Sequence, residues 1–90
     1  MSARALDVTV TGLVQGVFFR ARCAEEADRL GVTGWVSNEY DGSVAGHFEG
    51  PPRAVEALVE WCHLGSPRSR VDAVRTRDAE VGGFTSFQAR

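Results

Sequence analysis

The segment LDVTVTGLVQGVFFR, residues 6–20, combines a strand pattern, a glycine-rich loop and the start of a helix. Apolar and polar residues alternate over residues 6–11, which is typical of a half-buried β-strand. Gly12 ends this alternation, and residues 13–19 read as a loop. From about Arg20 the apolar positions recur at helical spacing, so the sequence predicts a helix directly after the loop.

Hydrophobic periodicity and breaker residues define the elements outside that segment. The first helix stops at Gly31, because glycine adopts the left-handed conformation cheaply. The dipeptide Asp41-Gly42 is a strong turn signal between two strand patterns and predicts a β-hairpin. The predicted elements are a strand at 6–11, a helix at 20–30, strands at 32–38 and 43–49, a helix between Gly50 and Gly65, and a strand at 71–74. The sequence allows, without requiring, a short fifth strand at 84–88.

The order β-α-β-β-α-β predicts an α+β protein with a ferredoxin-like split βαβ sandwich. Each helix has one apolar stripe, so both helices should cover one face of an antiparallel sheet of four to five strands. The opposite face of the sheet would carry Thr9, Thr11, Ala45 and His47. With 90 residues there is room for a single domain, spanning 1–90.

Composition excludes several classes of function. The ten positive residues are all arginine, and with 12 acidic residues they give a net charge of −2, which argues against general binding to nucleic acid or to an anionic membrane. Apolar runs such as Val17-Phe18-Phe19 are too short for a transmembrane helix, and the first residues lack the apolar core of a signal peptide. We expect Cys23 and Cys62 to be buried free thiols in a reducing, cytoplasmic setting, and the protein to be a monomer.

The loop that ends at the first helix has the composition of an anion site. Backbone N–H groups at a helix N-terminus lack intrahelical partners, and the helix dipole favours negative charge there. Gly12 and Gly16 let the loop curl, and Arg20 adds a planar cation that matches phosphate or carboxylate. The alternative is that the glycines only make turns and Arg20 is a solvated surface residue.

Three segments in the same order resemble the acylphosphatase family. They are residues 12–20, residues 30–38 and the Asp41-Gly42-Ser43-Val44 turn, and the likeness continues in Phe48-Glu49-Gly50, Trp61-Cys62 and Gly65-Ser66-Pro67. The resemblance implies hydrolysis of the carboxyl–phosphate bond of a small-molecule acyl phosphate, giving a carboxylate and inorganic phosphate, without a metal or an organic cofactor.

The resemblance also implies roles for individual residues. Arg20 and Asn38 would be catalytic, with Asn38 holding the attacking water. Because the site would bind the phosphoryl oxygens, inorganic phosphate should be both a product and a competitive inhibitor. Ser37 and Ser43 depart mildly from the family pattern. The phosphate would be bound by the segment Gln15, Gly16, Val17, Phe18, Phe19 and Arg20.

Two other functions share this element order. An RNA-recognition domain would need stacking aromatic residues on the open sheet face, where the sequence places no pair of them, and the sequence has no RNP1-like Arg-Gly-Phe string. Acylphosphatase-like segments also occur as the first part of larger carbamoyl-transferring maturation proteins.

His47 and His63 have no evident partner for nucleophilic or metal chemistry in the sequence, so no metal site is expected.

Overall fold

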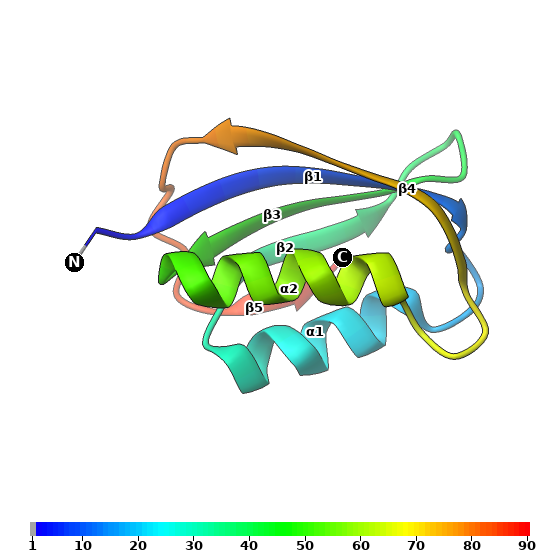
Figure 1. Ribbon diagram of the computed structural model, residues 1–90, viewed down its shortest axis with the longest axis horizontal. Helices are drawn as coiled ribbons and strands as arrows, with labels where there is room; N and C mark the ends of the chain where they lie inside the picture. Colours follow the sequence, from blue (N-terminus) through cyan, green and yellow to red (C-terminus); the bar gives the residue numbers. More distant parts are fainter. Residues whose placement is uncertain (1) are drawn as a thin grey trace.

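The computed structural model describes residues 2–90, and its five strands and two helices follow the predicted order. Figure 1 shows how these elements are arranged. Helix α1 ends at Gly31, which has a left-handed backbone (φ 79°), and α2 begins with a proline in its first turn, as the sequence indicates. The elements are β1 (Arg4–Leu13), α1 (Phe19–Leu30), β2 (Thr33–Asn38), β3 (Val44–Gly50), α2 (Pro52–Leu64), β4 (Arg70–Ala79) and β5 (Phe87–Ala89).

The strands form one sheet in the order β4-β1-β3-β2-β5. The predicted ferredoxin-like sandwich is confirmed, with antiparallel pairing between β4 and β1, between β1 and β3, and between β3 and β2. The fifth strand runs parallel to β2, so the sheet is mixed rather than wholly antiparallel. This strand is at Phe87–Ala89 instead of 84–88, because the backbone N–H of Phe84 bonds to the Glu49 carboxylate and not to a neighbouring strand.

Both helices lie on one face of the sheet, in front of the strands in Figure 1. The alternation in β1 turns Leu6, Val8 and Val10 toward the helices, and all three are buried. Cys23 and Ala27 of α1 and Val55, Leu58 and Cys62 of α2 complete this core with buried residues of β2 and β3.

Strand β1 is longer than its alternating pattern, and the prediction that it ends before Gly12 was wrong. Its pairing with β4 shifts between Thr11 and Gly12 and then continues to Leu13. Gly12 has φ 123°, and a Cβ atom there would lie 2.2 Å from the backbone oxygen of Arg70. Gly12 therefore forms a β-bulge inside the strand, and β1 continues past it to the start of the following loop.

Strand β4 is also longer than the predicted 71–74, because it extends to Ala79. Its second half pairs with β1, with Ala79 opposite Ala5 and Arg75 opposite Thr9. Most side chains of this edge strand are exposed, so its residues lack the hydrophobic alternation by which a strand is recognised.

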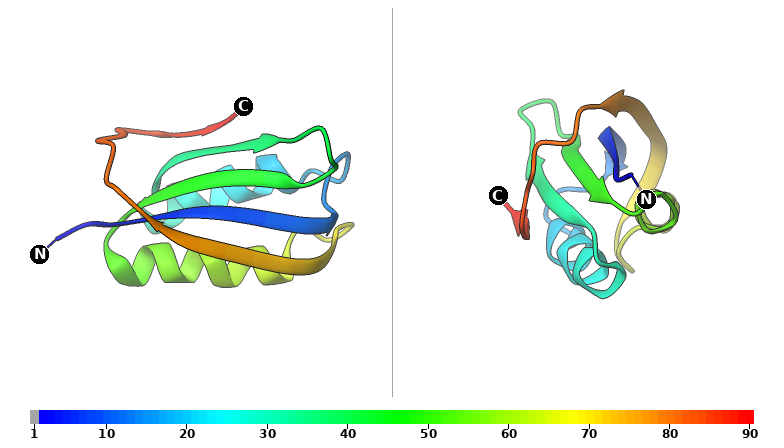
Figure 2. Two further views of the ribbon diagram at one scale, coloured as in Figure 1. Left: turned by 90° about the horizontal axis from the view of Figure 1, so that it is seen from above. Right: turned by 90° about the vertical axis from the view of Figure 1, so that its left-hand side faces the viewer.

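The sheet face opposite the helices carries Thr9, Thr11, Ala45 and His47, as expected, but part of this face is covered. The connection from β4 to β5 crosses one end of the sheet (Figure 2). Phe84 in this connection lies against His47, with ring centroids 5.3 Å apart, and His47 is buried.

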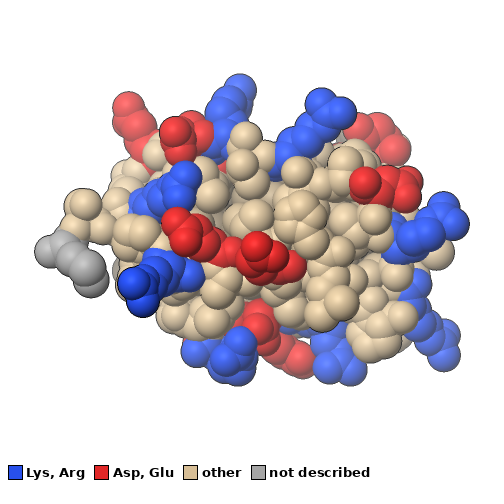
Figure 3. Space-filling model, viewed as in Figure 1, with Lys and Arg blue, Asp and Glu red and all other residues tan. Residues whose placement is uncertain are grey.

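The surface carries both signs of charge. Figure 3 shows Arg and Asp or Glu residues interspersed, without a continuous basic region on this face. Within residues 2–90 no helix is long and apolar enough to cross a membrane.

Candidate functional site

The β1–α1 loop has an unusual backbone conformation. Gly16 has φ 73° and Phe18 has φ 63°, and Phe18 is the one non-glycine residue among 2–90 with a positive φ. A left-handed conformation is unfavourable for a residue with a Cβ atom, and Phe18 is 72% exposed, so burial of the ring does not offset the cost. Such strain is concentrated at functional sites.

The loop and the first turn of α1 present a series of unpartnered backbone donors. The N-cap residue Phe18 makes no side-chain cap, and the first helical hydrogen bond runs from Arg22 N–H to Phe18 O at 3.1 Å. The backbone N–H groups of residues 15–21 donate to no other group of the described chain. We call residues 15–18 with the first turn of α1 the cradle. Its donors and the positive end of the helix dipole together favour an anion.

Arg20 is the second residue of α1, and its contacts place it near the end of β2. Its guanidinium donates a hydrogen bond to the backbone oxygen of Arg90, whose N–H donates to the Val36 oxygen at 2.8 Å. The Arg90 guanidinium lies over the Trp35 ring, 4.7 Å from its centroid. Arg20 is therefore linked through one residue to β2, two positions before Asn38.

Asn38 is the last residue of β2, and it is exposed. It lines a surface hollow of about 420 Å³ together with Gln15, Glu39 and Tyr40. The Gln15 side chain donates to the backbone oxygens of Glu39, at 2.7 Å, and Ser43, at 2.9 Å. This side chain thus ties the cradle to the β2–β3 turn, which leaves the Gln15 backbone N–H as the group free to meet a ligand.

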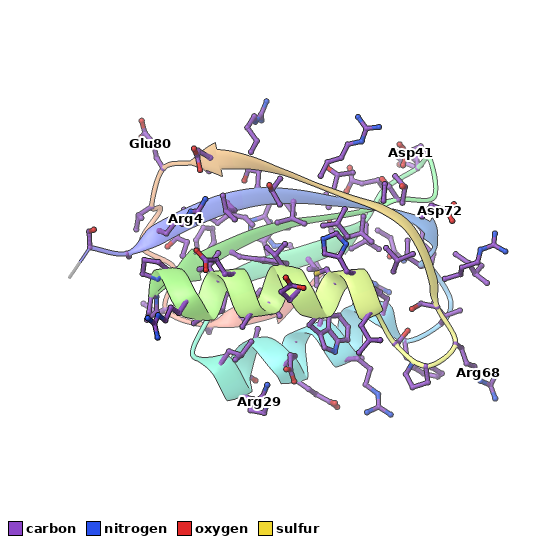
Figure 4. All side chains as sticks on the ribbon, in the orientation of Figure 1. Arg4, Arg29, Asp41, Arg68, Asp72 and Glu80 are labelled. Atoms are coloured by element: carbon purple, nitrogen blue, oxygen red, sulfur yellow. The ribbon has the colours of Figure 1, made fainter. Side chains whose placement is uncertain are left out.

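The elements around the cradle meet at one end of the molecule. Figure 4 labels Asp41 in the β2–β3 turn and Arg68 in the α2–β4 connection at the end where β1 passes into α1. Asp41 accepts from the backbone N–H and hydroxyl of Ser43, and these bonds lower the pKa of its carboxyl. Ser37 donates to the Glu39 carboxylate at 2.9 Å. The structure therefore brings two segments near each other, residues 15–20 and the end of β2: Gln15 and Asn38 line one hollow, and Arg20 is linked through Arg90 to Val36.

Sequence reasoning missed a hydroxyl that holds the cradle from inside. The Ser66 hydroxyl, in the α2–β4 connection, donates to the Val17 oxygen at 2.7 Å, and Ser66 is buried. A buried serine directly after a helix is the available signal, because a buried polar group needs a partner. The link between Arg20 and Arg90 had no signal in the sequence.

A cluster of titratable groups lies away from the cradle, on the opposite face of the sheet. His47 bonds through Nδ1 to Asp7 at 2.8 Å and through Nε2 to Glu49 at 2.7 Å. Burial on its own lowers the pKa of His47, but the bonds to the two carboxylates outweigh it and raise that pKa above its ordinary value. The Glu49 carboxylate also accepts from the backbone N–H groups of Gly82, Gly83 and Phe84. The cluster thus anchors the β4–β5 connection, a function that alternation alone did not indicate.

The remaining candidate residues are in the core. Cys23 and Cys62 are free and buried, as expected. The Phe19 ring, at the start of α1, lies against Trp61 of α2 with centroids 5.1 Å apart and fixes the base of the cradle. Within residues 2–90 no group of three or more His, Cys, Asp or Glu side chains could hold a metal ion.

The chain is similar to known proteins over nearly its whole length. The family model described as Acylphosphatase matches residues 6–89. An acylphosphatase of a Nocardioides species is 57% identical over 86 residues, covering 96% of this chain and 87% of the relative. An acylphosphatase of Geobacter sulfurreducens is 52% identical and covers 100% of this chain and 99% of the relative.

A solved structure agrees with these sequence matches. The crystal structure of an acylphosphatase from Bacillus subtilis superposes with a TM-score of 0.94 at 35% identity, covering 97% of this chain and 98% of that one. The loop, the arginine and the asparagine described above lie within the matched residues. The chain therefore belongs to the acylphosphatase family.

Proposed function

We propose that the cradle and Arg20 hold the phosphoryl group of an acyl phosphate while Asn38 orients the attacking water. As a member of its family the protein is a hydrolase of acyl phosphates. In the reaction the water oxygen bonds to phosphorus, and the carboxyl–phosphate bond breaks. The carboxylate leaves with the electron pair, and the second product is inorganic phosphate.

The observation that carries this proposal is the run of free donors in the cradle. The N–H groups of residues 15–21 have no partner within the described chain, and they lie in the loop and first turn at the N-terminus of α1, in the same segment as the permanent cation of Arg20. A phosphoryl group in transfer spreads negative charge over its oxygens, so fixed donors stabilise it without needing to reorganise. Gln15, Gly16, Val17, Phe18, Phe19 and Arg20 supply the binding segment.

Asn38 suits the water because its amide is neutral and carries both donors and an acceptor. It can orient a water molecule at any pH at which the protein is folded. Asn38 lines the same hollow as Gln15, which supports a role for its amide next to the cradle. The water proton passes to a phosphoryl oxygen, and no side-chain base takes part.

The setting of the enzyme follows from the same features. We infer that residues 1–90 form one domain that acts as a cytoplasmic monomer on a small-molecule substrate. Two buried, unpaired cysteines support a reducing compartment. Inorganic phosphate, as product, shares the contacts of the substrate phosphoryl group and should inhibit competitively.

Comparing Arg20→Ala with Asn38→Ala tests these roles. Asn38→Ala should abolish hydrolysis of benzoyl phosphate yet leave the Kd for inorganic phosphate within about threefold, because it removes an interaction used mainly in the transition state. Arg20→Ala should lose both, because it removes a charge-assisted contact to the bound phosphate. Calorimetry on folded variants measures the binding.

Gln88→Ala, at an exposed residue of β5, is the control and should behave as the wild type. A folded, active Asn38→Ala protein would contradict the water-positioning role. An Asn38→Ala protein that no longer binds phosphate would instead assign Asn38 to the phosphate site.

A further inference from the structure

We propose that Ser66 is a positioning residue for catalysis, which acts by aiming the backbone N–H of Phe18 at the bound phosphoryl group. The inference rests on the proposed function of the cradle and adds a residue from a distant segment. Ser66 lies in the α2–β4 connection, 49 residues from Val17, and its hydroxyl donates to the Val17 oxygen at 2.7 Å.

The argument begins with the geometry of one peptide unit. The Val17 oxygen and the Phe18 N–H belong to the same planar peptide group, and no peptide bond of the described chain is cis. In a trans peptide the C=O and N–H bonds point in opposite directions. Because the Val17 oxygen is turned inward to a buried hydroxyl, the Phe18 N–H must point away from Ser66, on the solvent side of the loop.

The conformation of Phe18 explains why such a hold is needed. Its left-handed backbone (φ 63°, ψ 21°) is unfavourable for a residue with a Cβ atom. Its exposed ring contributes little burial, so the side chain does not fix the backbone. Strained backbone persists where the surroundings impose it, and the Ser66 bond adjoins the strained residue directly.

Ser66 is rigid enough to serve as this support. It is 3% exposed, and its own backbone oxygen accepts from the Ser69 hydroxyl at 2.7 Å and from the Ser69 N–H at 3.0 Å. On the other side of the cradle, Gln15 is tied to the β2–β3 turn. The loop is thus fixed at two points, and the peptide between Val17 and Phe18 is the one held by Ser66.

The first experiment compares Ser66→Ala with Ser69→Ala. Ser69→Ala is a matched control, because it removes a hydroxyl from the same connection while the Ser69 N–H keeps its bond to the Ser66 oxygen. For each protein, urea unfolding gives stability, calorimetry gives the Kd of inorganic phosphate, and benzoyl phosphate hydrolysis gives kcat and KM.

Ser66→Ala should lower kcat/KM and weaken phosphate binding by about 10- to 100-fold, less than the roughly 10²–10³ that removal of a whole preorganised donor costs, because the Phe18 N–H is misaligned rather than lost. Ser69→Ala should leave both within about threefold. Wild-type phosphate affinity and kcat in folded Ser66→Ala would overturn the proposal, as would equal losses in the two variants.

A second measurement does not depend on either variant folding. Inorganic phosphate is titrated into the ¹⁵N-labelled wild-type protein, and the backbone N–H resonances of residues 15–21 are followed. A shift of the Phe18 N–H resonance among the largest, saturating with its neighbours, is the expected result. An unchanged Phe18 resonance while those of Gly16 and Arg20 shift would overturn the role of Ser66 alone. No shift in any of these resonances would contradict the proposed cradle itself.

Discussion

The guanidinium of Arg20 donates a hydrogen bond to the backbone oxygen of Arg90, which joins the first turn of α1 to the end of β5. Arg20 therefore has a structural partner before any substrate binds. A guanidinium carries five N–H donors in a fixed plane, so it can keep this bond and still present donors to a phosphoryl group. A lysine ammonium lacks that planar fork.

Arg20→Lys should therefore lower kcat/KM for benzoyl phosphate by about 10²–10³, the cost of losing one preorganised donor. Arg22→Lys is the control, because Arg22 is exposed, lies two positions later in the same helix and pairs only loosely with Glu25, at 3.8 Å. Steady-state kinetics on both variants measures the difference. Near-wild-type turnover by Arg20→Lys would show that guanidinium geometry is unimportant.

Inorganic phosphate should raise the apparent KM for benzoyl phosphate and leave kcat unchanged, because both ligands present the same oxygens to the cradle. Initial rates at several phosphate concentrations, with EDTA present throughout, give the pattern.

The wild-type rate should be the same with and without EDTA. Loss of activity with EDTA that zinc or magnesium restores would contradict the proposed mechanism.

The His47 cluster should make stability depend on pH in two directions. The folded-state pKa of His47 is raised, so its contribution is complete below the ordinary value of 6.5 and is lost as the pH rises through the higher folded value. Burial on its own raises the pKa of Glu49. The hydrogen bond from the Gly82 backbone N–H, and then those from His47 and the Phe84 N–H, outweigh burial and lower that pKa. The contribution of Glu49 is therefore present above 4.5 and is lost as the pH falls.

Urea unfolding from pH 3 to pH 9 checks this expectation. The free energy of unfolding should be highest between about pH 4.5 and pH 6.5. In His47→Gln the decline above pH 6.5 should be reduced, because Asp7 and Glu49 no longer face a titrating ring. Parallel pH profiles for the two proteins would exclude His47 as the source.

Neither cysteine should react with a thiol reagent in the native protein. The pKa of Cys23 is raised, first by its hydrogen bond with Cys62 and then by burial, so the reactive thiolate is scarce. At pH 8, Ellman's reagent should detect no fast thiol until the protein is unfolded in guanidinium chloride, when both should react. Rapid labelling of a native thiol would show that the α1–α2 interface opens.

The sequence alone predicts the order of the elements, because each helix and each central strand has a clear hydrophobic period. It fails at β4, whose exposed edge position removes that period, and at Gly12, where one glycine could end a strand or form a bulge. The orientation of β5 depended on how the β4–β5 connection is anchored, and that anchor is Glu49.

The sequence indicates the segment of the candidate site that is continuous along the chain, but not the long-range contacts that support it. Gly16 and Arg20 lie in one short segment, so the loop and its cation are readable together. The bond from Ser66 to Val17 joins two segments that local periodicity cannot relate. Glu49 is buried because the β4–β5 connection, which is remote in the sequence, covers its carboxylate and supplies its donors.

The supports of the cradle also bear on how the protein folds. Gln15, Val17 and Arg20 are held by residues 28, 49 and 70 positions away, so none of these bonds can form before large chain loops have closed. Topologies dominated by such remote pairings fold slowly, typically in milliseconds to seconds. Helical secondary structure should therefore return early in refolding, while phosphate affinity returns only with the last, slowest phase. The recovery of enzymatic activity during refolding would then report when the native sheet is complete.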